Sequence, residues 1–309
     1  MGFTMKTLTF TFLTLLAFAT PASAQLHGIN LSGGEFKDVE GGTLIPRPAD
    51  VQAYYNAGFR LFRFPLKASH FDRSDATAKW IAVANACIAL DVPCIFDRHE
   101  YKWPAAAEQV AFWVKVRNRL PKSDLIQFDI MNEPKGFNDP VLTSDWDQWA
   151  RDSRLIIHRL RAAGVTNRIW LEYPGWSGID RFSHAAKALK RQGNIDDPLR
   201  RTGIQAHRYA DKDGSGTSTY CDSKKMSSHF GIFARQVHEL GMPALVGEAA
   251  FGKTKGCEEI ATAWLAEMKA GIPNLYGVTW WGGGRAWSPK YFYKISPLPN
   301  AYTRRLTGH

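Results

Sequence analysis

Short apolar runs alternate with longer amphipathic segments along most of this chain. Seven segments have helical periodicity, and glycine lies just past the end of four of them, as is typical of helix C-termini. The predicted helices are Ala49–Ala57, Ala76–Leu90, Ala106–Leu120, Ser144–Ala163, Arg181–Gln192, Ser228–Leu240 and Cys257–Lys269. Eight shorter apolar runs have the length of buried strands. The predicted strands are His27–Leu31, Leu61–Leu66, Cys94–His99, Ile126–Glu133, Arg168–Tyr173, Gly203–Tyr209, Ala244–Ala250 and Gly277–Trp281.

This alternation indicates one fold class. Strands that alternate with helices form a parallel sheet. Eight such units most naturally close as a (β/α)8 TIM barrel, an α/β fold that forms a single domain of roughly 250 residues. No Ser/Thr/Pro-rich linker divides residues 25–309, and the region after the eighth strand is short and Pro-rich. We therefore expect one catalytic domain with a short or irregular eighth helix.

Residues 1–24 have the pattern of a secretory signal peptide. Lys6 is the only charged residue, an apolar run covers Leu8–Ala19, and the small residues Ala22 and Ala24 mark a cleavage site. The apolar run is shorter than the roughly 20 residues that a membrane-spanning helix needs. We expect cleavage after Ala24, a secreted or periplasmic protein, and no membrane anchor.

Composition narrows the classes of function. Apolar residues make up 45% and charged residues 22% of the 309 residues, which is typical of a globular protein and excludes a disordered chain. The formal net charge is +10, but it is dispersed, and the longest basic runs are pairs such as Arg200–Arg201. This distribution and the predicted export argue against a nucleic-acid partner. Attraction to an acidic polymer remains an alternative.

Four cysteines, Cys87, Cys94, Cys221 and Cys257, lie in the predicted exported chain. Export permits disulfides, and four cysteines allow three pairings. The absence of C-x-x-C spacing argues against a thiolate zinc site. Residues 211–222 approximate the spacing of a calcium loop, but a strand rather than a helix precedes them and the twelfth position lacks Glu. We expect neither a metal nor a cofactor, with this loop as a weak alternative.

Polar side chains gather where the predicted strands end. Because the active site of a (β/α)8 barrel lies at the C-terminal ends of its strands, these residues are the candidates for chemistry. They are Arg63 on the second strand, residues 97–101 at the third, Asn132 and Glu133 at the fourth, His207 and Tyr209 at the sixth, Glu248 at the seventh, and Trp281 at the eighth.

Two of these residues, Glu133 and Glu248, end otherwise apolar strands. Burying a carboxylate is costly unless it is paired or protonated, so a lone Glu is most simply half of a structural ion pair, here with Arg63. Two carboxylates that face each other across a barrel mouth, flanked by Asn132 and His207, instead indicate acid/base or nucleophilic chemistry.

The ordered motifs resemble glycoside hydrolase family 5, and most of all its fungal-type endo-β-1,4-glucanase (cellulase) subfamily. They are GINLSGGEF at 28–36, RFP at 63–65, DRHEY at 97–101, NEP at 132–134, YPGWSG at 173–178, HRYADKDGSGT at 207–217, GE at 247–248 and TWW at 279–281. An isolated NEP is a weak signal. The ordered set covers about residues 27–290 and is specific, and it implies hydrolysis of a β-glucan.

The resemblance also implies roles for individual residues. Glu133 is the expected acid/base and Glu248 the expected nucleophile. The residues expected to line the cleavage subsite are Arg63, His99, Asn132, His207, Tyr209 and Trp281. The cysteine spacings resemble those of the subfamily as well, which favours the pairs Cys87–Cys94 and Cys221–Cys257.

Retaining chemistry gives each of these groups a task. The two carboxyl groups of a retaining glycosidase stand about 5–5.5 Å apart. Glu248 attacks as an ion that Arg63 and Tyr209 stabilise, while its charge favours the protonated form of Glu133. Asn132 is placed to donate to a sugar 2-hydroxyl. Trp281 offers a flat face to a sugar ring, and Trp103, Trp176 and Trp287 are either further platforms or ordinary packing residues.

Four positions depart from the family pattern and introduce charge. Glu100 replaces an Asn, Lys135 replaces a common His, Arg208 replaces a frequent Gln, and Arg285 lies in a rewritten last motif. A neutral glucan needs none of these charges. An acidic exopolysaccharide with a β-1,4-glucan backbone is therefore an alternative substrate, unless Arg208 points outward toward a helix and Glu100 neutralises a cation of the cleft.

One alternative lies outside the enzymes. A catalytically silent carbohydrate-binding barrel would need neither Glu133 nor Glu248, so the presence of both with their polar neighbours argues against it. Asn30-Leu31-Ser32 matches a glycosylation sequon, but it follows a buried strand and we interpret it as coincidental. We expect a monomer whose partner is a polysaccharide.

Overall fold

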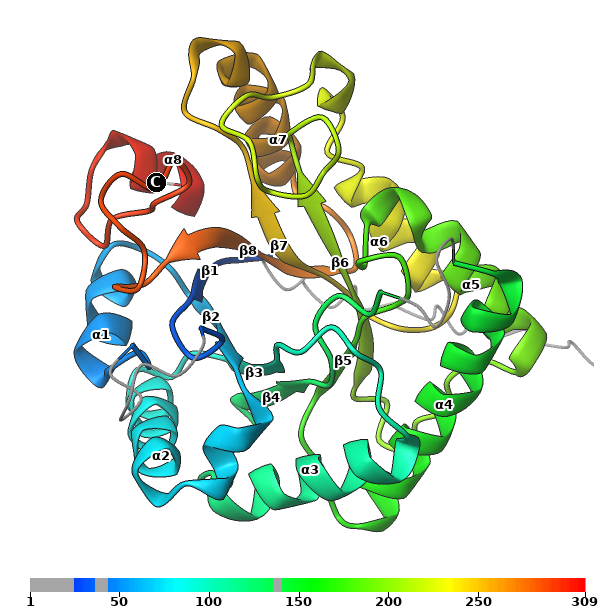
Figure 1. The fold of residues 1–309 in the computed structure, drawn as a ribbon. Coiled ribbons are helices and arrows are strands. Elements are labelled where there is room, and N and C mark those ends of the chain that lie inside the picture. Colours follow the sequence, from blue (N-terminus) through cyan, green and yellow to red (C-terminus); the bar gives the residue numbers. More distant parts are fainter. Residues whose placement is uncertain (1–24, 37–43, 136–140, 309) are drawn as a thin grey trace, which may run out of the picture.

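The computed structural model describes residues 25–36, 44–135 and 141–308, so the predicted signal peptide lies outside the described residues. Eight parallel strands pair in chain order and close into a barrel, with the helices around it (Figure 1). The strands are β1 (Leu26–Leu31), β2 (Leu61–Leu66), β3 (Cys94–Arg98), β4 (Ile126–Asp129), β5 (Ile169–Leu171), β6 (Thr202–Tyr209), β7 (Ala244–Ala250) and β8 (Leu275–Gly283). The predicted single-domain (β/α)8 barrel is confirmed.

The helices follow the strands in the expected order. They are α1 (Pro48–Asn56), α2 (Ser74–Ala89), α3 (Ala106–Arg119), α4 (Thr143–Ala162), α5 (Phe182–Gln192), α6 (Phe230–His238), α7 (Glu258–Ala270) and α8 (Ala301–Thr307). Helix α6 begins two residues later than predicted because His229 has a φ of +65°, which an α-helix does not accommodate. Among the described residues, no helix is long and apolar enough to span a bilayer.

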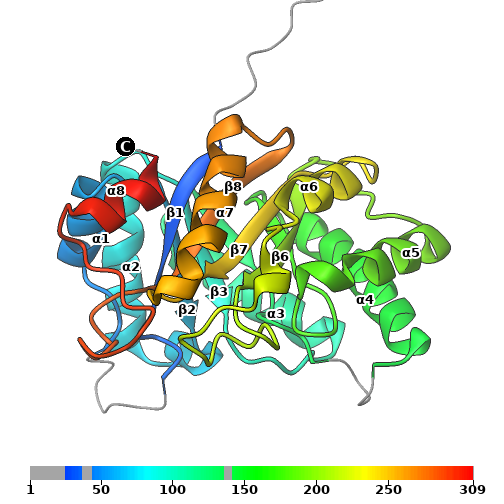
Figure 2. The ribbon, with the colours of Figure 1, turned by 90° about the horizontal axis from the view of Figure 1, so that it is seen from above.

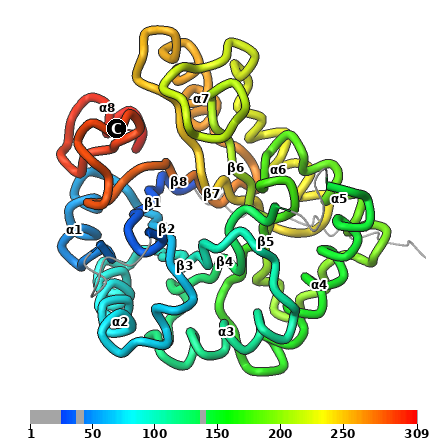
Figure 3. Tube along the Cα trace, in the orientation of Figure 1, coloured from blue at the N-terminus to red at the C-terminus, as the bar shows by residue number. Residues whose placement is uncertain are grey.

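The eighth helix is short, as predicted. It has seven residues, and the carbonyl of Leu306 accepts hydrogen bonds from the indole of Trp280 at 3.2 Å and from the Nδ1 atom of His27 at 2.9 Å. These bonds attach α8 to strands β8 and β1, so the C-terminal segment completes the outer ring beside α1 (Figure 3).

The barrel interior has an apolar layer below a polar one. Leu61, Ile95, Trp170 and Leu245 form the apolar layer. Because strand side chains alternate between faces, the residues two positions further along these strands also point inward. On three of these strands they are Arg63, Asp97 and Glu172, and all three are fully buried. The sequence therefore places charged groups at the C-terminal end of the interior.

A β-bulge in β7 changes which face Glu248 occupies. Leu245 lies inside the barrel, so strict alternation would turn Glu248 outward toward the helices. The pairing register with β6 shifts between Ala206 and His207, and the pairing with β8 shifts between Val246 and Ala249. A bulge re-aims the following side chain, and Glu248 consequently points into the barrel beside His207.

Strand β4 is shorter than predicted, and Glu133 follows it in a loop. The strand ends at Asp129, and Glu133 has a φ of +41°, which no strand residue adopts. The backbone N–H of Glu133 donates to the Glu172 carboxylate at 2.7 Å instead of joining the sheet. Strand β5 is likewise confined to three residues.

Two disulfides join neighbouring segments. Cys87–Cys94 links α2 to β3, and Cys221–Cys257 links the loop after β6 to the 3-10 turn before α7. Figure 1 shows the second pair of segments lying side by side. The pairing favoured by the family resemblance is confirmed. The loops that follow the strands lie at one end of the barrel (Figure 2).

Candidate active site

The structure brings together all ten residues that the sequence singled out. Arg63 lies within β2, and the other nine lie near the C-terminal ends of strands or in the loops that follow: Glu133, Glu248, His99, Asn132, His207, Tyr209, Trp281, Trp176 and Trp287. Their contacts form one network, which begins at the two carboxylates.

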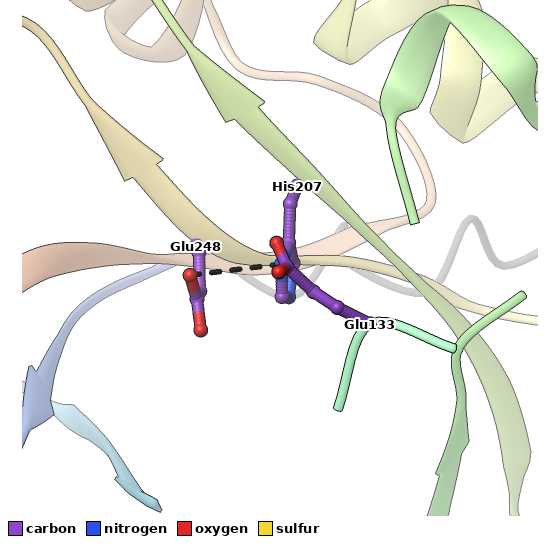
Figure 4. A group of neighbouring side chains, drawn as sticks. All are labelled: Glu133, His207 and Glu248. Atoms are coloured by element: carbon purple, nitrogen blue, oxygen red, sulfur yellow. Dashed lines mark hydrogen bonds and ion pairs between the residues drawn. The ribbon is translucent and has the colours of Figure 1, made fainter. Parts of the chain in front are cut away.

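Glu133, His207 and Glu248 form the centre of this network (Figure 4). The Nδ1 atom of His207 lies 2.8 Å from a carboxylate oxygen of Glu133 and 3.6 Å from one of Glu248. Oxygen atoms of the two carboxylates lie within 4.8 Å of each other. The side chains come from different elements, so only the closed barrel places the two carboxylates in one site.

Two strong donors hold Glu248. A guanidinium nitrogen of Arg63 donates to one carboxylate oxygen at 2.8 Å, and the Tyr209 hydroxyl donates to the other at 2.5 Å. Burial and the adjacent charge of Glu248 raise the pKa of Tyr209 well above its ordinary value, so its hydroxyl keeps its proton. Charge-assisted bonds of this kind stabilise an ionised carboxylate.

Arg63 is fully buried and contacts further acids. Its guanidinium lies 3.1 Å from Asp97, 2.9 Å from Asp129 and 3.0 Å from Glu172. Burial raises the pKa of Asp97 and of Asp129 well above the ordinary range, so both favour their protonated forms. Burial also opposes the charge of Glu172, but the neighbouring His207 and Arg63 cations lower its pKa below the ordinary value.

His99 is neutral in this network. Burial lowers its pKa to about 4. Its Nδ1 atom lies 2.6 Å from Asp97 and its Nε2 atom lies 3.0 Å from the Tyr101 hydroxyl, an arrangement that fits Nδ1 as the donor and Nε2 as the acceptor. The ring stacks nearly parallel to Trp281, with centroids 6.0 Å apart. His99 therefore links the charged centre to Trp281, the first residue of an aromatic wall that Trp281 and Trp287 form.

A cleft of about 620 Å³ opens beside Glu133. Tyr101, Trp176, His207 and residues 213–215 contribute to its lining. Trp176 is 47% exposed and keeps a free ring surface, as a sugar platform requires. The Lys135 ammonium lies 5.1 Å from the centroid of this ring. The loop that resembled a calcium site thus contributes to the wall of the cleft.

The other candidate tryptophans differ in their surroundings. Trp287 packs against Trp281 with centroids 5.7 Å apart and stacks on Tyr291 at 4.1 Å. It therefore extends the aromatic wall on the β8 side. Trp103 is only 8% exposed, and its indole nitrogen donates to Asp152 on α4 at 3.3 Å. For Trp103, ordinary packing is the correct interpretation.

The sequence of the chain matches the model of one protein family. The sequence model described as Cellulase (glycosyl hydrolase family 5) matches residues 19–285. The chain belongs to glycosyl hydrolase family 5. Membership makes this protein a glycoside hydrolase.

Relatives of this family 5 enzyme cover most of its length. Endoglucanase 3 of Humicola insolens is 28% identical over 303 residues, which are 90% of this chain and 75% of that protein. An endo-beta-1,4-glucanase structure from Xanthomonas axonopodis pv. citri has a TM-score of 0.78 at 23% identity, covering 92% of this chain and 98% of the other. The structure of XacCel5A in complex with cellopentaose has the same score and identity, covering 92% and 99%.

The charged departures from the family pattern are mostly paired away from the carboxylates. Glu100 accepts from Arg98 at 2.8 Å, so the alternative in which it neutralises a cation of the cleft is not supported. Arg208 points outward as expected, bonding Asp180 at 2.5 Å and packing over Trp264. Arg285 donates to the carbonyl of Ile45 and lies 3.8 Å from Asp50 on α1.

In this family 5 enzyme, the acidic residues that resemble cation sites already contact hydrogen-bond donors of the protein. Asp211 accepts backbone hydrogen bonds from Gly216, Thr217 and Ser218, which shape the loop that approximates a calcium site. The oxygens of Asp97, Asp129 and Glu172 lie close enough for a cation, and the guanidinium of Arg63 contacts all three.

Three inward residues were not among the predicted site residues. Asp129, Glu172 and Gln205 are buried in the polar layer and contact one another. Each is a polar residue inside or directly after an apolar run, two positions beyond an inward residue of its own strand. This spacing of two residues is the sequence signal that could have identified them, because every second residue of a strand faces the same side of the sheet.

Proposed function

We propose that this family 5 enzyme is a retaining endo-β-1,4-glucanase. The observation that carries the proposal is the pair Glu133 and Glu248, whose oxygens lie within 4.8 Å of each other across the barrel mouth. Retaining glycosidases keep their carboxyl groups about 5–5.5 Å apart, whereas inverting enzymes separate them by about 6.5–9.5 Å to admit a water. The spacing supports direct attack by one of these carboxylates.

In the first step Glu248 is the nucleophile. Its carboxylate attacks the anomeric carbon and forms a glycosyl ester, while Glu133 protonates the glycosidic oxygen and the leaving chain departs. Arg63 and Tyr209 donate to the two oxygens of the attacking carboxylate at 2.8 and 2.5 Å and so orient it. No added cofactor is needed for this step.

In the second step Glu133 changes from acid to base. It removes a proton from water, the water oxygen attacks the anomeric carbon, and the bond to Glu248 breaks. The ring of His207, 2.8 Å from Glu133 and 3.6 Å from Glu248, places a positive charge between the two carboxylates. Burial opposes this charge, but the carboxylates of Glu172 and Glu248 raise the pKa of His207 well above its ordinary value.

A neutral β-1,4-glucan is the substrate that the surroundings support best. Trp176, Trp281 and Trp287 offer aromatic faces along the site, and sugar rings stack on such faces. The matched relatives are endoglucanases, and XacCel5A was determined with cellopentaose. We further propose that the enzyme is secreted after loss of residues 1–24 and acts as a monomer on polysaccharide.

An acidic polymer with the same backbone is the second candidate. Lys135 supports it, because its ammonium lies over Trp176 at the edge of the cleft and is in none of the ion pairs found among the described residues. Arg208 and Arg285 do not add to this argument, since Asp180 and Asp50 face them. The two substrates differ in how binding responds to salt.

Product analysis tests the proposal. The enzyme is incubated with cellopentaose and with a soluble β-1,4-glucan, and the released reducing ends are counted and sized. An endoglucanase lowers the chain length of the polymer rapidly. The Glu248→Gln variant serves as the blank. If the wild-type enzyme releases no more reducing ends from either substrate than an incubation without enzyme, the proposed activity is wrong.

A further inference from the structure

Glu172 contacts both parts of the acid/base assembly. It follows β5 and is fully buried. One carboxylate oxygen accepts the backbone N–H of Glu133 at 2.7 Å, and the other lies 3.2 Å from the Nε2 atom of His207. The Nδ1 atom of the same ring contacts the side chain of Glu133. Glu172 therefore contacts the backbone of Glu133 directly and reaches the Glu133 carboxylate indirectly, through the ring of His207.

The backbone contact restrains an unfavourable conformation. Glu133 has a φ of +41°, in the left-handed region that costs a non-glycine residue of order 1–3 kcal/mol. Such a conformation persists where surrounding groups hold it, and Glu172 gives the part-buried N–H of Glu133 its partner. Loss of this bond frees the backbone that aims the Glu133 side chain.

The second contact concerns the charge on His207. Both ring nitrogens face carboxylates: Nε2 faces Glu172, and Nδ1 faces Glu133 and Glu248. Only the imidazolium form can donate from both nitrogens. The groups around Glu172 itself are Arg63, Asp129, Gln205 and His207.

We propose that Glu172 is a positioning residue of the active site, which fixes the backbone of Glu133 and holds His207 as a donor toward both catalytic carboxylates. This inference rests on the proposed roles of Glu133 and Glu248. Glu172 itself is separated from the cleft by His207 and the Glu133 backbone, so it acts through these two residues and not on the sugar.

The test combines Glu172→Gln with an NMR measurement of His207. The amide keeps the size of the side chain and removes its charge. Ring ¹⁵N shifts report whether His207 is imidazolium, and a His207→Asn variant assigns its signals among the nine histidines. In the wild type we expect imidazolium through the neutral range. In Glu172→Gln the midpoint falls by about 1–3 pH units, as expected when an opposite charge a few ångströms away is removed.

A matched control separates this effect from general destabilisation. Asp197 is a largely buried carboxylate that precedes the N-terminal end of β6, where it pairs with Arg161 at 2.9 Å, whereas the site lies at the C-terminal end of the strand. Asp197→Asn lowers stability through a lost buried pair, but we expect His207 to titrate as in the wild type. Thermal melts of both variants show that the comparison is made on folded protein.

Activity provides the second readout. The Gln amide oxygen can still accept the Glu133 N–H, so the variant mainly affects His207. In Glu172→Gln we expect kcat on cellopentaose to fall by roughly 10²-fold, the lower end of what proton donation to a reacting group contributes, with the alkaline limb of the pH profile moved to lower pH. An unchanged His207 titration in Glu172→Gln overturns the inference. Inactivity of the wild type on cellopentaose contradicts the proposed function instead, and the NMR comparison still decides the role of Glu172.

Discussion

The side chain of Gln205 occupies the space in which a Cβ atom on Gly247 would lie. A Cβ built on Gly247 would come within 2.1–2.5 Å of the amide group of Gln205. That amide is itself fixed, because it donates to Asp129 at 2.6 Å and also to Glu172. Glycine at position 247 thus allows the bulge that turns Glu248 inward while the polar layer stays packed.

Gly247→Ala should therefore affect stability and activity together. The methyl group forces Gln205 out of its bonds or shifts the bulge, and overpacking of this kind costs about 1–3 kcal/mol. We expect a lower midpoint in urea unfolding and reduced kcat. Gly256→Ala is the control, because a Cβ there meets nothing within 4 Å. Wild-type stability and kcat in Gly247→Ala would contradict the assignment of this contact.

Glu133 and Glu248, the two carboxylates proposed as catalytic, should respond differently to conversion to amides. Glu248→Gln removes the nucleophile, so turnover should disappear for every leaving group. Glu133→Gln removes acid assistance, so aryl glycosides with good leaving groups should lose least in the glycosylation step. Initial rates on cellopentaose and on an activated aryl cellobioside measure the difference.

Glu239→Gln on the surface controls for the amide exchange, since the exposed Glu239 side chain makes a loose 4.0 Å pair with the exposed Lys190. General acid/base catalysis is worth roughly 10²–10⁴ in rate. Retention of more than about a hundredth of the wild-type rate in Glu248→Gln would therefore exclude a direct nucleophilic role.

The sequence predicted the strands, their order and the convergence of the ten candidate site residues because each depends on local pattern or on the end of a strand. The inward turn of Glu248 was not predictable in this way, since alternation from Leu245 points it outward and the bulge depends on pairing with β6 and β8. Glu172 was missed because its importance arises from neighbours on other strands. Glu100 pairs with Arg98 because β3 ends there and the chain turns at Tyr101, whose φ is +61°.

The anomeric configuration of the product should match that of the substrate. Attack by Glu248 inverts the anomeric centre once and attack by water inverts it again, so the first product is the β-anomer. Proton NMR during the first minutes of hydrolysis, before mutarotation, records it. Initial α-product would indicate an inverting enzyme, which the separation of under 4.8 Å between Glu133 and Glu248 oxygens does not accommodate.

Stability should decline on the alkaline side because of His207. Its folded pKa lies well above 6.5, so the folded protein binds more protons than the unfolded chain between these two values. The contribution is therefore complete below about pH 6.5 and is lost as pH rises through the folded pKa, with a slope of up to about 1.4 kcal/mol per pH unit. Urea titrations at pH 6 to 9 measure it, and His207→Asn should flatten this limb.

His99 should make the free energy of unfolding fall on the acidic side. Its pKa is lowered to about 4 by burial, so the unfolded chain binds the extra proton between pH 4 and 6.5. Stability consequently falls as pH decreases through this window. A His99→Asn variant should lose this acidic slope while keeping the alkaline one. Equal acidic slopes in the variant and the wild type would show that other groups cause it.

Two disulfides should contribute unequally to stability. Cys221 and Cys257 are 36 residues apart, whereas Cys87 and Cys94 are separated by seven. In the chain-entropy account the longer loop stabilises by about 4 kcal/mol and the shorter by about 2 kcal/mol. Paired Cys→Ala variants compared by urea unfolding test this order, and a larger loss from the shorter loop would contradict it.

Salt dependence should separate a neutral from an acidic substrate, and Lys135 is the residue on which the difference depends. Its ammonium lies 5.1 Å from the centroid of the Trp176 ring, beside a cleft where Arg208 is already paired with Asp180. Attraction to polymer carboxylates is screened over about 8 Å at physiological ionic strength. KM on an acidic β-1,4-glucan should then rise with salt, while KM on a neutral glucan stays constant. Lys135→Gln should remove this difference and spare the neutral substrate, and Lys190→Gln on α5 should leave it intact. Identical salt profiles for both polymers in the wild type would eliminate the acidic substrate and leave neutral β-1,4-glucan as the sole candidate.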